Sequence, residues 1–375
     1  MEVIRPTTAA EVETAVRGAL SDRARIEVTG SGTRRYLGAP VMAERQLSLA
    51  GLDRIVAYEP EELVLTVEPG LPMTALAALL ARHGQHLPFE PPVSGTIGGV
   101  VAANLSGPRR MRAGAARDFV LGVSAISGFG EKFKAGGQVV KNVTGYDIPR
   151  LLAGSFGTLA VITRLTLKVL PAPSTSATIV FPDLTPQDGC ALLRACAGSA
   201  IEPSGCAYTL DGRQGSAFVR IEGARAAMDE RLRGLEKFAG RHGDRLDDHR
   251  AEAFWRDLAS PEELLRVAAH EALWRLSVPM SHAPAILAAA DRGLVDCAGG
   301  RIWVIGADGS EAPPIASDAG SAMLYRAPET MRRACPLFSE SPAVDALARR
   351  VKAVFDPHGL LNPGRMRAED MSHAC

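Results

Sequence analysis

The sequence predicts an α+β fold with two domains, on the basis of three observations. Residues 1–85 alternate between apolar residues at helical spacing and short strands with a period of two. A glycine-rich stretch follows, and the proline-rich segment 171–176 then interrupts the chain, because proline blocks both helix continuation and a ladder hydrogen bond. Beyond this linker, short strands alternate with helices again, which indicates a second α/β layer.

The elements expected before the linker rest on local patterns. Thr8 and Glu11 have the spacing of a capping box and precede apolar residues at helical spacing. Pro72 suits the first turn of a second helix that extends to His83. The stretch from Pro88 to Phe133 is glycine-rich and is predicted to be loop-like. The remaining predicted elements are strands over 26–29, 63–68 and 159–170 and a helix over 147–152.

The elements expected after the linker form a separate series. Helices are predicted over 186–197 and 224–241. A last helix over 343–355 leads into the sequence Asp-Pro-His-Gly-Leu-Leu-Asn-Pro-Gly-Arg at 356–365. The predicted strands are 177–181, 205–210, 217–222, 272–278 and 301–305.

Composition and charge exclude several classes of protein. Of the 375 residues, 46% are hydrophobic, which is enough to bury a sizeable core. The 42 Lys and Arg balance the 42 Asp and Glu, so the net charge favours neither nucleic acid nor an anionic membrane as a partner. No signal-peptide pattern is present, and no apolar run approaches the roughly 20 residues of a membrane span. Six cysteines without a C-x-x-C pair fit a reducing cytoplasm and give no metal or iron–sulfur pattern.

The first glycine segment, Gly30-Ser31-Gly32-Thr33, directly follows a predicted strand. Glycines allow a loop to turn its backbone N–H groups inward as a concave anion site. The third glycine of the dinucleotide motif G-x-G-x-x-G is absent, because Arg35 stands at that position. By itself this segment fits an ordinary surface turn better than a binding site.

The second glycine segment extends over 92–104 and combines small residues with apolar ones. Two interpretations are open: tight packing of a helix on a strand, or close approach of the backbone to a pyrophosphate and a flat ring. We favour the second. A third segment begins at 141–147 and continues through Gly154 and Gly157 into an apolar strand.

Together, in this order, the three segments resemble the FAD-binding domain of the vanillyl-alcohol oxidase (PCMH) type. The resemblance covers about residues 3–171, and the tail at 356–365 matches the D-P-x-x-x-L-N-P-G-K/R ending of that family. It implies a two-lobed PCMH-type FAD-binding domain over 1–171. It also implies an α/β cap domain on the substrate side over 172–340 and a segment over 341–375 that returns to the FAD domain.

Three shorter stretches, at 87–92, 105–110 and 273–276, are similar to the FAD-binding E subunits of bacterial glycolate oxidases (glycolate dehydrogenases). This narrower resemblance implies oxidation of glycolate, a small 2-hydroxy acid, to glyoxylate. It implies two partners, an FAD-containing catalytic sister subunit and an iron–sulfur subunit that takes the electrons. The expected location is the cytoplasm, with contact to the inner membrane only through such partners.

The same resemblance assigns residues to the cofactor. The first loop should meet the pyrophosphate, and the second segment should pack beside pyrophosphate and ring. The tail residues should return to the flavin, and Asp118 should stabilise the cradle, while Gly107 and Gly114 are weaker assignments. The residues expected to bind FAD are Gly30, Ser31, Gly32, Thr33, Gly95, Thr96, Ile97, Gly98, Gly99, Gly107, Asp118, Gly154, Gly157, Ile162, Asn362 and Arg365.

Binding of FAD is expected to be non-covalent, because neither glycine loop contains His or Cys, and His83 and His86 are interpreted as helix-end histidines. The catalytic sister subunits carry G-D-G-N-x-H and E-H-G stretches for a metal, and neither occurs here, so no metal is expected. No catalytic base is assigned.

Arg275 is the candidate ligand for a substrate carboxylate, since it lies within an apolar strand. A position at the surface or in a structural ion pair explains it at least equally well. Arg109, Arg110 and Arg112 are expected on a solvated loop, with the flavin phosphates or a partner as alternatives. Two other functions stay open: a self-sufficient FAD-dependent oxidase of a sugar or small alcohol, and a non-catalytic assembly subunit.

Overall fold

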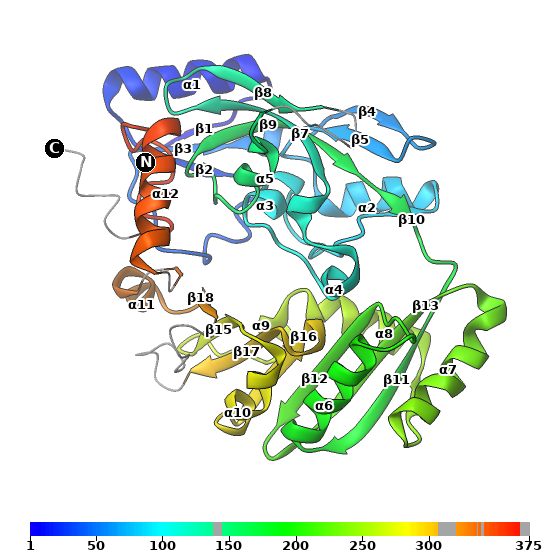
Figure 1. Cartoon of the computed structure of the whole chain (residues 1–375). Helices are drawn as coiled ribbons and strands as arrows, with labels where there is room; N and C mark the ends of the chain where they lie inside the picture. The colour runs from blue at the N-terminus through cyan, green and yellow to red at the C-terminus, as the bar shows by residue number, and fades with distance from the viewer. Residues whose placement is uncertain (138–144, 307–319, 336, 339–340, 368–375) are drawn as a thin grey trace.

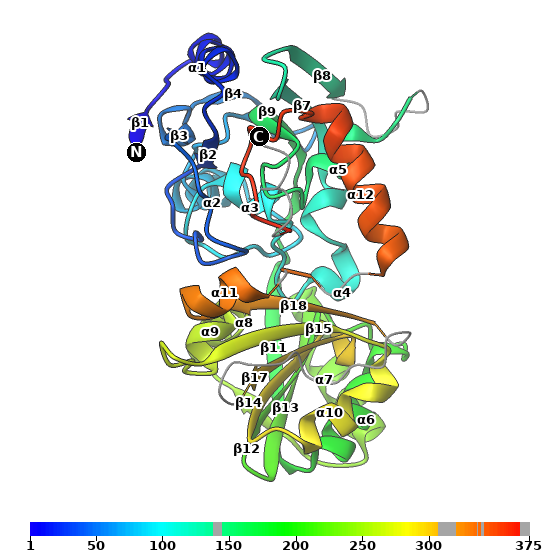
Figure 2. The ribbon, with the colours of Figure 1, turned by 90° about the vertical axis from the view of Figure 1, so that its left-hand side faces the viewer.

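The computed structural model describes residues 1–137, 145–306, 320–335, 337–338 and 341–367. Helices and strands are mixed throughout, which confirms the α+β class (Figure 1). Elements β1 to β10 together with α12 form what we call the first unit, and β11 to β18 with their helices form the second unit (Figures 1 and 2). No helix in the described part of the chain is long and apolar enough to cross a bilayer.

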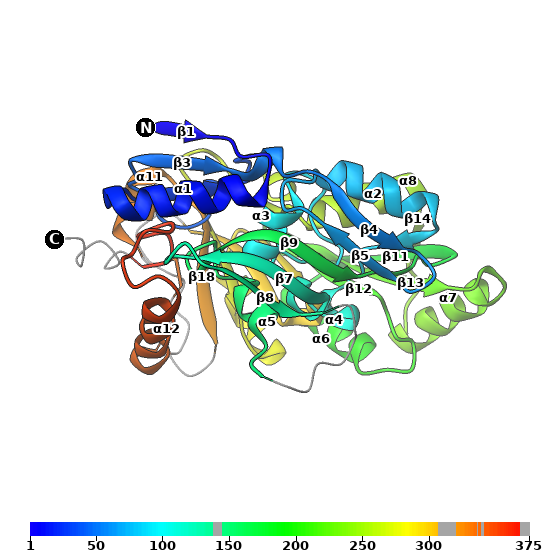
Figure 3. The same ribbon diagram turned by 90° about the horizontal axis from the view of Figure 1, so that it is seen from above.

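Two sheets organise the first unit. A small parallel sheet has the order β1-β3-β2, and a five-stranded antiparallel sheet has the order β4-β5-β9-β7-β8. Helix α1 packs between them and runs alongside β3 (Figure 3). The strands are β1 (Glu2–Ile4), β2 (Ile26–Thr29), β3 (Arg45–Ser48), β4 (Ile55–Glu59), β5 (Val64–Val67), β6 (Gln85–His86), β7 (Val120–Ser127), β8 (Lys132–Gly136), β9 (Ala160–Lys168) and β10 (Leu170–Pro171). The helices are α1 (Ala9–Asp22), α2 (Met73–Arg82), α3 (Ile97–Ala102), α4 (Arg110–Ala113), α5 (Ile148–Leu152) and α12 (Pro342–Phe355).

The second unit is one antiparallel sheet of eight strands in the order β14-β11-β13-β12-β16-β17-β15-β18. Helices α6, α7 and α10 cover one face, and the other face is turned toward the first unit (Figure 1). Its strands are β11 (Thr175–Leu184), β12 (Gly205–Asp211), β13 (Gln214–Gly223), β14 (Asp244–Leu246), β15 (Ala272–Ser277), β16 (Arg292–Asp296), β17 (Arg301–Gly306) and β18 (Ser321–Arg326). Its helices are α6 (Pro186–Ala197), α7 (Arg225–Ala239), α8 (Asp248–Leu258), α9 (Pro261–Leu264), α10 (Ala283–Ala288) and α11 (Glu329–Ala334).

Side-chain hydrogen bonds determine where helix α1 begins, as the sequence predicted. The Thr8 hydroxyl accepts from the Glu11 N–H at 3.3 Å. The Glu11 carboxylate accepts from the N–H of Thr7 rather than of Thr8, so the capping box is shifted by one residue. Each of these bonds satisfies a donor that the helix leaves unpaired.

The prediction of a loop-like stretch over 88–133 was wrong. It contains α3, α4 and the whole of β7, and β8 begins at its end. Strand β7 lies between β8 and β9 and is largely buried on both faces, so its sequence lacks the alternation that marks a half-exposed strand. The proposed third glycine segment is only partly visible, since residues 141–144 lie outside the described part.

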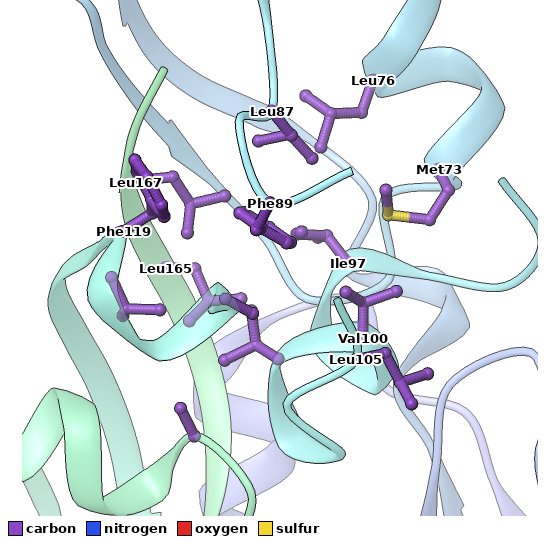
Figure 4. Close-up of a cluster of buried hydrophobic side chains, with 14 of the residues drawn as sticks. Met73, Leu76, Leu87, Phe89, Ile97, Val100, Leu105, Phe119, Leu165 and Leu167 are labelled. Carbon is purple, nitrogen blue, oxygen red and sulfur yellow. The ribbon is translucent and has the colours of Figure 1, made fainter. Parts of the chain in front are cut away.

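Helix α3 is anchored by a hydrophobic cluster that includes side chains of α2 and β9 (Figure 4). Ile97 and Val100 of α3 are fully buried there, together with Leu165 of β9. A buried aliphatic side chain contributes about 1.5–3 kcal/mol. The cluster therefore fixes α3, and with it the glycines at the start of that helix.

Ion pairs join the two units. Arg220 of β13 donates through both terminal nitrogens to Glu90 at 2.8 Å, and Arg109 pairs with Glu222. Arg112 pairs with Glu202. Arg109 and Arg112 therefore bind the second unit. The expectation of a solvated loop face was wrong for the half-buried Arg109, because the loop lies against another part of the chain, whereas the pair of Arg112 with Glu202 is exposed.

The C-terminal segment returns to the first unit beside β2. Ile26 donates its N–H to Leu360 O at 2.8 Å, and Asn362 donates its N–H to Ile26 O at 2.9 Å. The carboxylate of Asp356 is fully buried and accepts from the N–H groups of Leu360 and Leu361 and from Lys352 Nζ. One carboxylate thus holds the turn that leads the chain from α12 to β2.

We predict that Asp356→Ala destabilises the fold by about 3–5 kcal/mol, because it leaves the Lys352 ammonium without a counter-charge and two backbone N–H groups without an acceptor. Urea unfolding followed by circular dichroism measures this. The control Glu329→Ala removes an exposed pair with Arg333 and should change the free energy of unfolding little. Equal effects of the two substitutions would contradict this role of Asp356.

Candidate cofactor site

A hollow in the first unit brings together the first glycine loop, α3 and the C-terminal tail. A second hollow adjoins it and shares much of its wall. The first is lined by Val28, Thr29, Gly30, Ser31, Gly32, Thr33, Arg34, Arg35, Leu37, Thr96, Gly99, Ala102, Ala103, Phe156, Asn362 and Arg365. The second adds Leu49, Pro69, Gly98, Gly157, Ala160 and Ile162. Eleven of the sixteen residues predicted for FAD, counted from these two sets, line the hollows.

The loop after β2 offers free backbone donors to the hollow. The N–H groups of Ser31, Gly32, Thr33 and Arg34 have no hydrogen-bond acceptor among the described residues. Backbone donors seldom stay unpaired unless water or a ligand satisfies them. Consecutive free N–H groups next to two arginines form a site suited to a pyrophosphate.

The glycines of the two segments serve different purposes. A Cβ on Gly30 would collide with the Thr96 hydroxyl, and one on Gly98 would lie 2.7 Å from Pro69 O. These two glycines allow close packing of the walls. A Cβ on Gly99 would meet only Thr96 Oγ1, at 3.5 Å, so the space in front of Gly99 is open.

Asn362 and Arg365 form part of the wall, but their hydrogen bonds go to the protein. Asn362 Oδ1 accepts from the Val28 N–H at 2.8 Å, and its Nδ2 donates to Phe156 O at 2.7 Å. Arg365 pairs with buried Glu27 and donates to Leu37 O at 3.0 Å. Burial lowers the pKa of Arg365 to about 10, so it stays charged at neutral pH. Both side chains therefore shape the hollow by holding the first loop.

Two predicted glycines and one aliphatic residue lie beside the hollow instead of in its wall. Gly95 has a φ of +87°, and a Cβ there would meet Arg34 at 2.5 Å. Ile97 is buried in the hydrophobic cluster of Figure 4. Gly154 has a φ of +92° and packs on Asn104, facing a separate groove next to α12.

Two further predicted residues lie farther away. Gly107 allows contact between the units, since a Cβ there would collide with Glu90 O and touch Ala259 of the second unit. Asp118 accepts from the Ala115 N–H at 2.8 Å and pairs with Arg150, so it braces a turn against α5. Neither residue lines the hollows, and Gly114 lies against Asp118 in the same turn.

Sequence reasoning missed several wall residues. Phe156 lies between Gly154 and Gly157 and adopts a φ of +53°, which turns its ring toward Phe338. Its position inside the glycine motif was the feature of the sequence from which Phe156 could have been predicted as a wall residue. Arg34 follows the first loop directly and donates to Ser94 O at 2.9 Å, which ties the first glycine segment to the second.

Arg275 lies on the face of the second sheet that is turned toward the first unit. Its neighbours across the ladder are Trp303 and Met323. On the same face, Arg301 donates to Ser106 O of the first unit at 2.8 Å. The Arg275 guanidinium has no hydrogen bond or ion pair in the described part of the chain, so the structural ion pair considered above is absent there.

The surroundings of Arg275 are cationic, and the residue is half-buried. Burial, together with the charges of Arg301 and Arg110, lowers the pKa of Arg275 to about 10. It remains a cation at neutral pH. Arg110 likewise makes no ion pair with any described residue, and the indole N–H of Trp303 is buried without an acceptor. Such an arrangement favours an anionic or acceptor-rich ligand between the units.

Other titratable groups do not form a site. Within the described ranges, no three His, Cys, Asp or Glu side chains are placed to hold a metal ion. Burial lowers the pKa of His86 to about 4, so this histidine is neutral at physiological pH. All five described cysteines carry free thiols, and burial raises the pKa of Cys190 and Cys196 to about 11.

Comparison with known proteins agrees with this geometry. Residues 2–136 match the family described as FAD binding domain, and residues 331–366 match the C-terminal domain of FAD linked oxidases. The glycolate oxidase subunit GlcE of Escherichia coli is 34% identical over 363 residues, covering 94% of this chain and 96% of GlcE. The chain belongs to the FAD-linked oxidase family that includes GlcE. It is an FAD-dependent oxidoreductase, which confirms the predicted family, cofactor and class of enzyme.

More distant relatives match over shorter regions. The D-lactate dehydrogenase of Anaerostipes hadrus is 34% identical over 188 residues, which are 48% of this chain and 38% of that enzyme. The glycolate oxidase subunit GlcD of Bacillus subtilis is 31% identical over 181 residues, or 48% of this chain and 38% of GlcD. A structure of alkyldihydroxyacetonephosphate synthase superposes with a TM-score of 0.73 over 96% of this chain and 76% of its own, at 16% identity, and shares the fold.

The fit of FAD to the hollow leads to a matched pair of substitutions. Gly99→Leu should lower FAD content at least tenfold with an unchanged far-UV spectrum, because its side chain enters open space in front of α3. Gly98→Leu should instead lower the melting temperature, because its side chain meets Pro69. FAD is measured in the supernatant after acid precipitation. Full occupancy in Gly99→Leu would show that the cofactor lies elsewhere.

Proposed function

We propose that this chain is the FAD-binding subunit of a glycolate oxidase (glycolate dehydrogenase) complex. In this proposal it takes part in the oxidation of glycolate to glyoxylate and passes electrons to a partner subunit. The main support is the match to GlcE along nearly its whole length. The domain roles follow: residues 1–171 and 341–375 bind FAD, and residues 172–340 cap the substrate side.

FAD supplies a two-electron acceptor when it is bound, and the protein supplies its position. The free N–H groups of Ser31 to Arg34 hold the pyrophosphate, and Thr96 and Gly99 lie against the cofactor. Gly157 and Ile162 complete the wall of the second hollow. The lining of the two hollows contains no His or Cys, so attachment is non-covalent, and a yellow protein pellet after acid precipitation would contradict this.

The substrate carboxylate is assigned to Arg275. Three observations support this assignment: the guanidinium is unpaired in the described part of the chain, it stays charged at neutral pH, and it faces the first unit. A guanidinium can hold a carboxylate through two parallel hydrogen bonds. Among the residues that the structure describes, none is assigned as the base for the hydroxyl proton, so the chemistry of that proton is attributed to a sister subunit.

The partners in this proposal are an FAD-containing catalytic sister subunit and an iron–sulfur subunit. The sequence contains no C-x-x-C pair that would hold a cluster, so a reduced flavin here needs a partner or a soluble acceptor. The complex would work in the cytoplasm and reach the inner membrane only through its other subunits.

Replacing Arg275 by Gln should raise the dissociation constant for glycolate or oxalate about 10–100-fold, since a charge-assisted pair contributes about 1.5–3 kcal/mol. Binding is followed by the change in the visible spectrum of the flavin in the isolated chain. Arg275→Lys should recover part of the affinity. Arg112→Gln, which removes an exposed pair with Glu202, is the control and should bind as the wild type.

The function itself is tested with an artificial electron acceptor and either glycolate or D-lactate as substrate. We expect the isolated chain to turn over glycolate far more slowly per flavin than the chain co-expressed with its two partner subunits. Equal rates would replace the proposal by a self-sufficient oxidase. A chain that assembles with its partners but contains no flavin would be an assembly subunit.

A further inference from the structure

Helix α12 presents an apolar stripe that the protein leaves exposed. Val344, Leu347, Val351 and Val354 recur at spacings of three, four and three, which places them on one side of the helix. The exposed fractions are 50% for Val344, 58% for Leu347 and 70% for Val354. Helix α12 is the last long helix of the described chain and contains no fully buried residue.

A groove of about 290 Å³ runs along this helix. Figure 2 shows α12 on the flank of the first unit, next to α5, and the groove lies between these helices. The α5 side contributes Leu151, which is 39% exposed, and Leu159. Met366 of the tail also lines it. A long apolar groove beside an exposed apolar stripe is a feature of surfaces that bind another polypeptide.

The charged residues around the groove are basic. Arg349, Lys352 and Arg367 line it, and no acidic residue among the described ones does. Asp345 is the single carboxylate of α12, and it is already bound to Arg349 and Arg367. Lys352 is bound to Asp356, so the exposed Arg350 is the cation of α12 that makes no ion pair with a described residue.

We propose that the groove between α5 and α12 is the docking site for an amphipathic helix of a partner subunit, whose apolar stripe is flanked by Asp or Glu. This inference rests on the proposed function, because it requires the heteromeric complex. Apolar residues spaced three and four apart fit the recognition of one helix by another. Arg350, which is exposed and makes no ion pair with described residues, is placed to meet an acidic flank.

Charge argues against a second copy of this chain as the occupant. Two α12 helices would bring two copies of Arg350 together, and Asp345, which is bound to Arg349 and Arg367, is not available to neutralise Arg350 of the other copy. Residues 368–375 contain a single large apolar side chain, Met371. One such side chain is too little to cover the four exposed residues on both sides of the groove.

The groove lies back to back with the cofactor site. Gly154 and Thr158 line the groove, while Phe156 and Gly157, in the same turn, line the hollows. Lys352 of α12 donates to Thr158 O at 2.6 Å and to Leu361 O at 3.1 Å. A partner docked on α12 would therefore sit behind the turn that forms part of the cofactor wall.

The experiment uses the affinity-tagged full chain co-expressed with the sister and iron–sulfur subunits. Leu347→Glu and Val354→Glu place a charge on exposed positions, so flavin content and far-UV circular dichroism should match the wild type. We expect recovery of the partner subunits, identified by mass spectrometry, to fall at least tenfold. Phe238→Glu on α7, an exposed apolar position of the second unit at 47%, is the control and should recover them fully.

Each other outcome overturns the docking site. Full recovery of the partners by Leu347→Glu would exclude this surface, while the complex itself would stand. No recovery by the wild-type chain would reject the heteromeric function and the docking site together. A wild-type homodimer that Leu347→Glu converts to a monomer in light scattering would assign the surface to a second copy. A rise in binding of a hydrophobic dye after removal of residues 368–375 would assign it to the chain's own C-terminus.

Discussion

The return of the C-terminal segment to β2 is the constraint on which the cofactor site depends. The backbone N–H groups of Ser31 to Arg34 have no hydrogen-bond acceptor among the described residues. The backbone on either side of this loop is held at Val28 by Asn362 and at Leu37 by Arg365, more than 300 positions away along the chain. Glu27 is almost completely buried, and its charge is compatible with burial because Arg35 and Arg365 both pair with it. The second unit lies between the first loop and the tail in the sequence. The wall of the hollow is therefore complete only where the chain returns to the first unit after the second.

The interface between the units contains two kinds of charged side chain: those paired with an opposite charge, and two arginines that are not paired with any described residue. Glu90, Arg109, Arg220 and Glu222 neutralise one another, and they hold the second sheet over the first unit. Arg275 and Arg110 lie in the same interface and have no counter-charge in the described chain. Burying a cation without a partner costs free energy, so a protein retains one mainly where a ligand supplies the missing charge. The paired arginines therefore have a structural role, and the contrast with them supports a binding role for Arg275 and Arg110.

The sequence predicted elements wherever a local pattern is strong. Helices α1, α2, α6 and α12 and strands β5, β9 and β13 lie within a few residues of their predicted places, because amphipathic periodicity, caps and alternation are local properties. Strand β7 and the late strands β16 and β18 were missed, since burial on both faces removes alternation. Most of the residues assigned to the cofactor line the hollows, but Ile97 packs in the core and Asp118 braces a turn, and binding itself stays a prediction. Sequence spacing does not say toward which side of a loop a residue points.

The two interpretations of the glycine segments apply to different glycines: the structure shows tight packing at some of them, and close approach to the cofactor stays a prediction for Gly99. Gly30, Gly98 and Gly157 are required by neighbouring protein atoms, since a Cβ would meet Thr96, Pro69 or Asn362. Gly99 is not required by any protein neighbour, and a Cβ on Gly32 would come no nearer than 3.7 Å to Arg35, although its φ of +76° favours glycine. Tight packing of the first three brings the backbone donors of the first loop next to α3, and the absence of a side chain on Gly99 keeps the space between them open. The packing and the binding space are thus produced by the same short segments, which explains why composition alone could not separate the two roles.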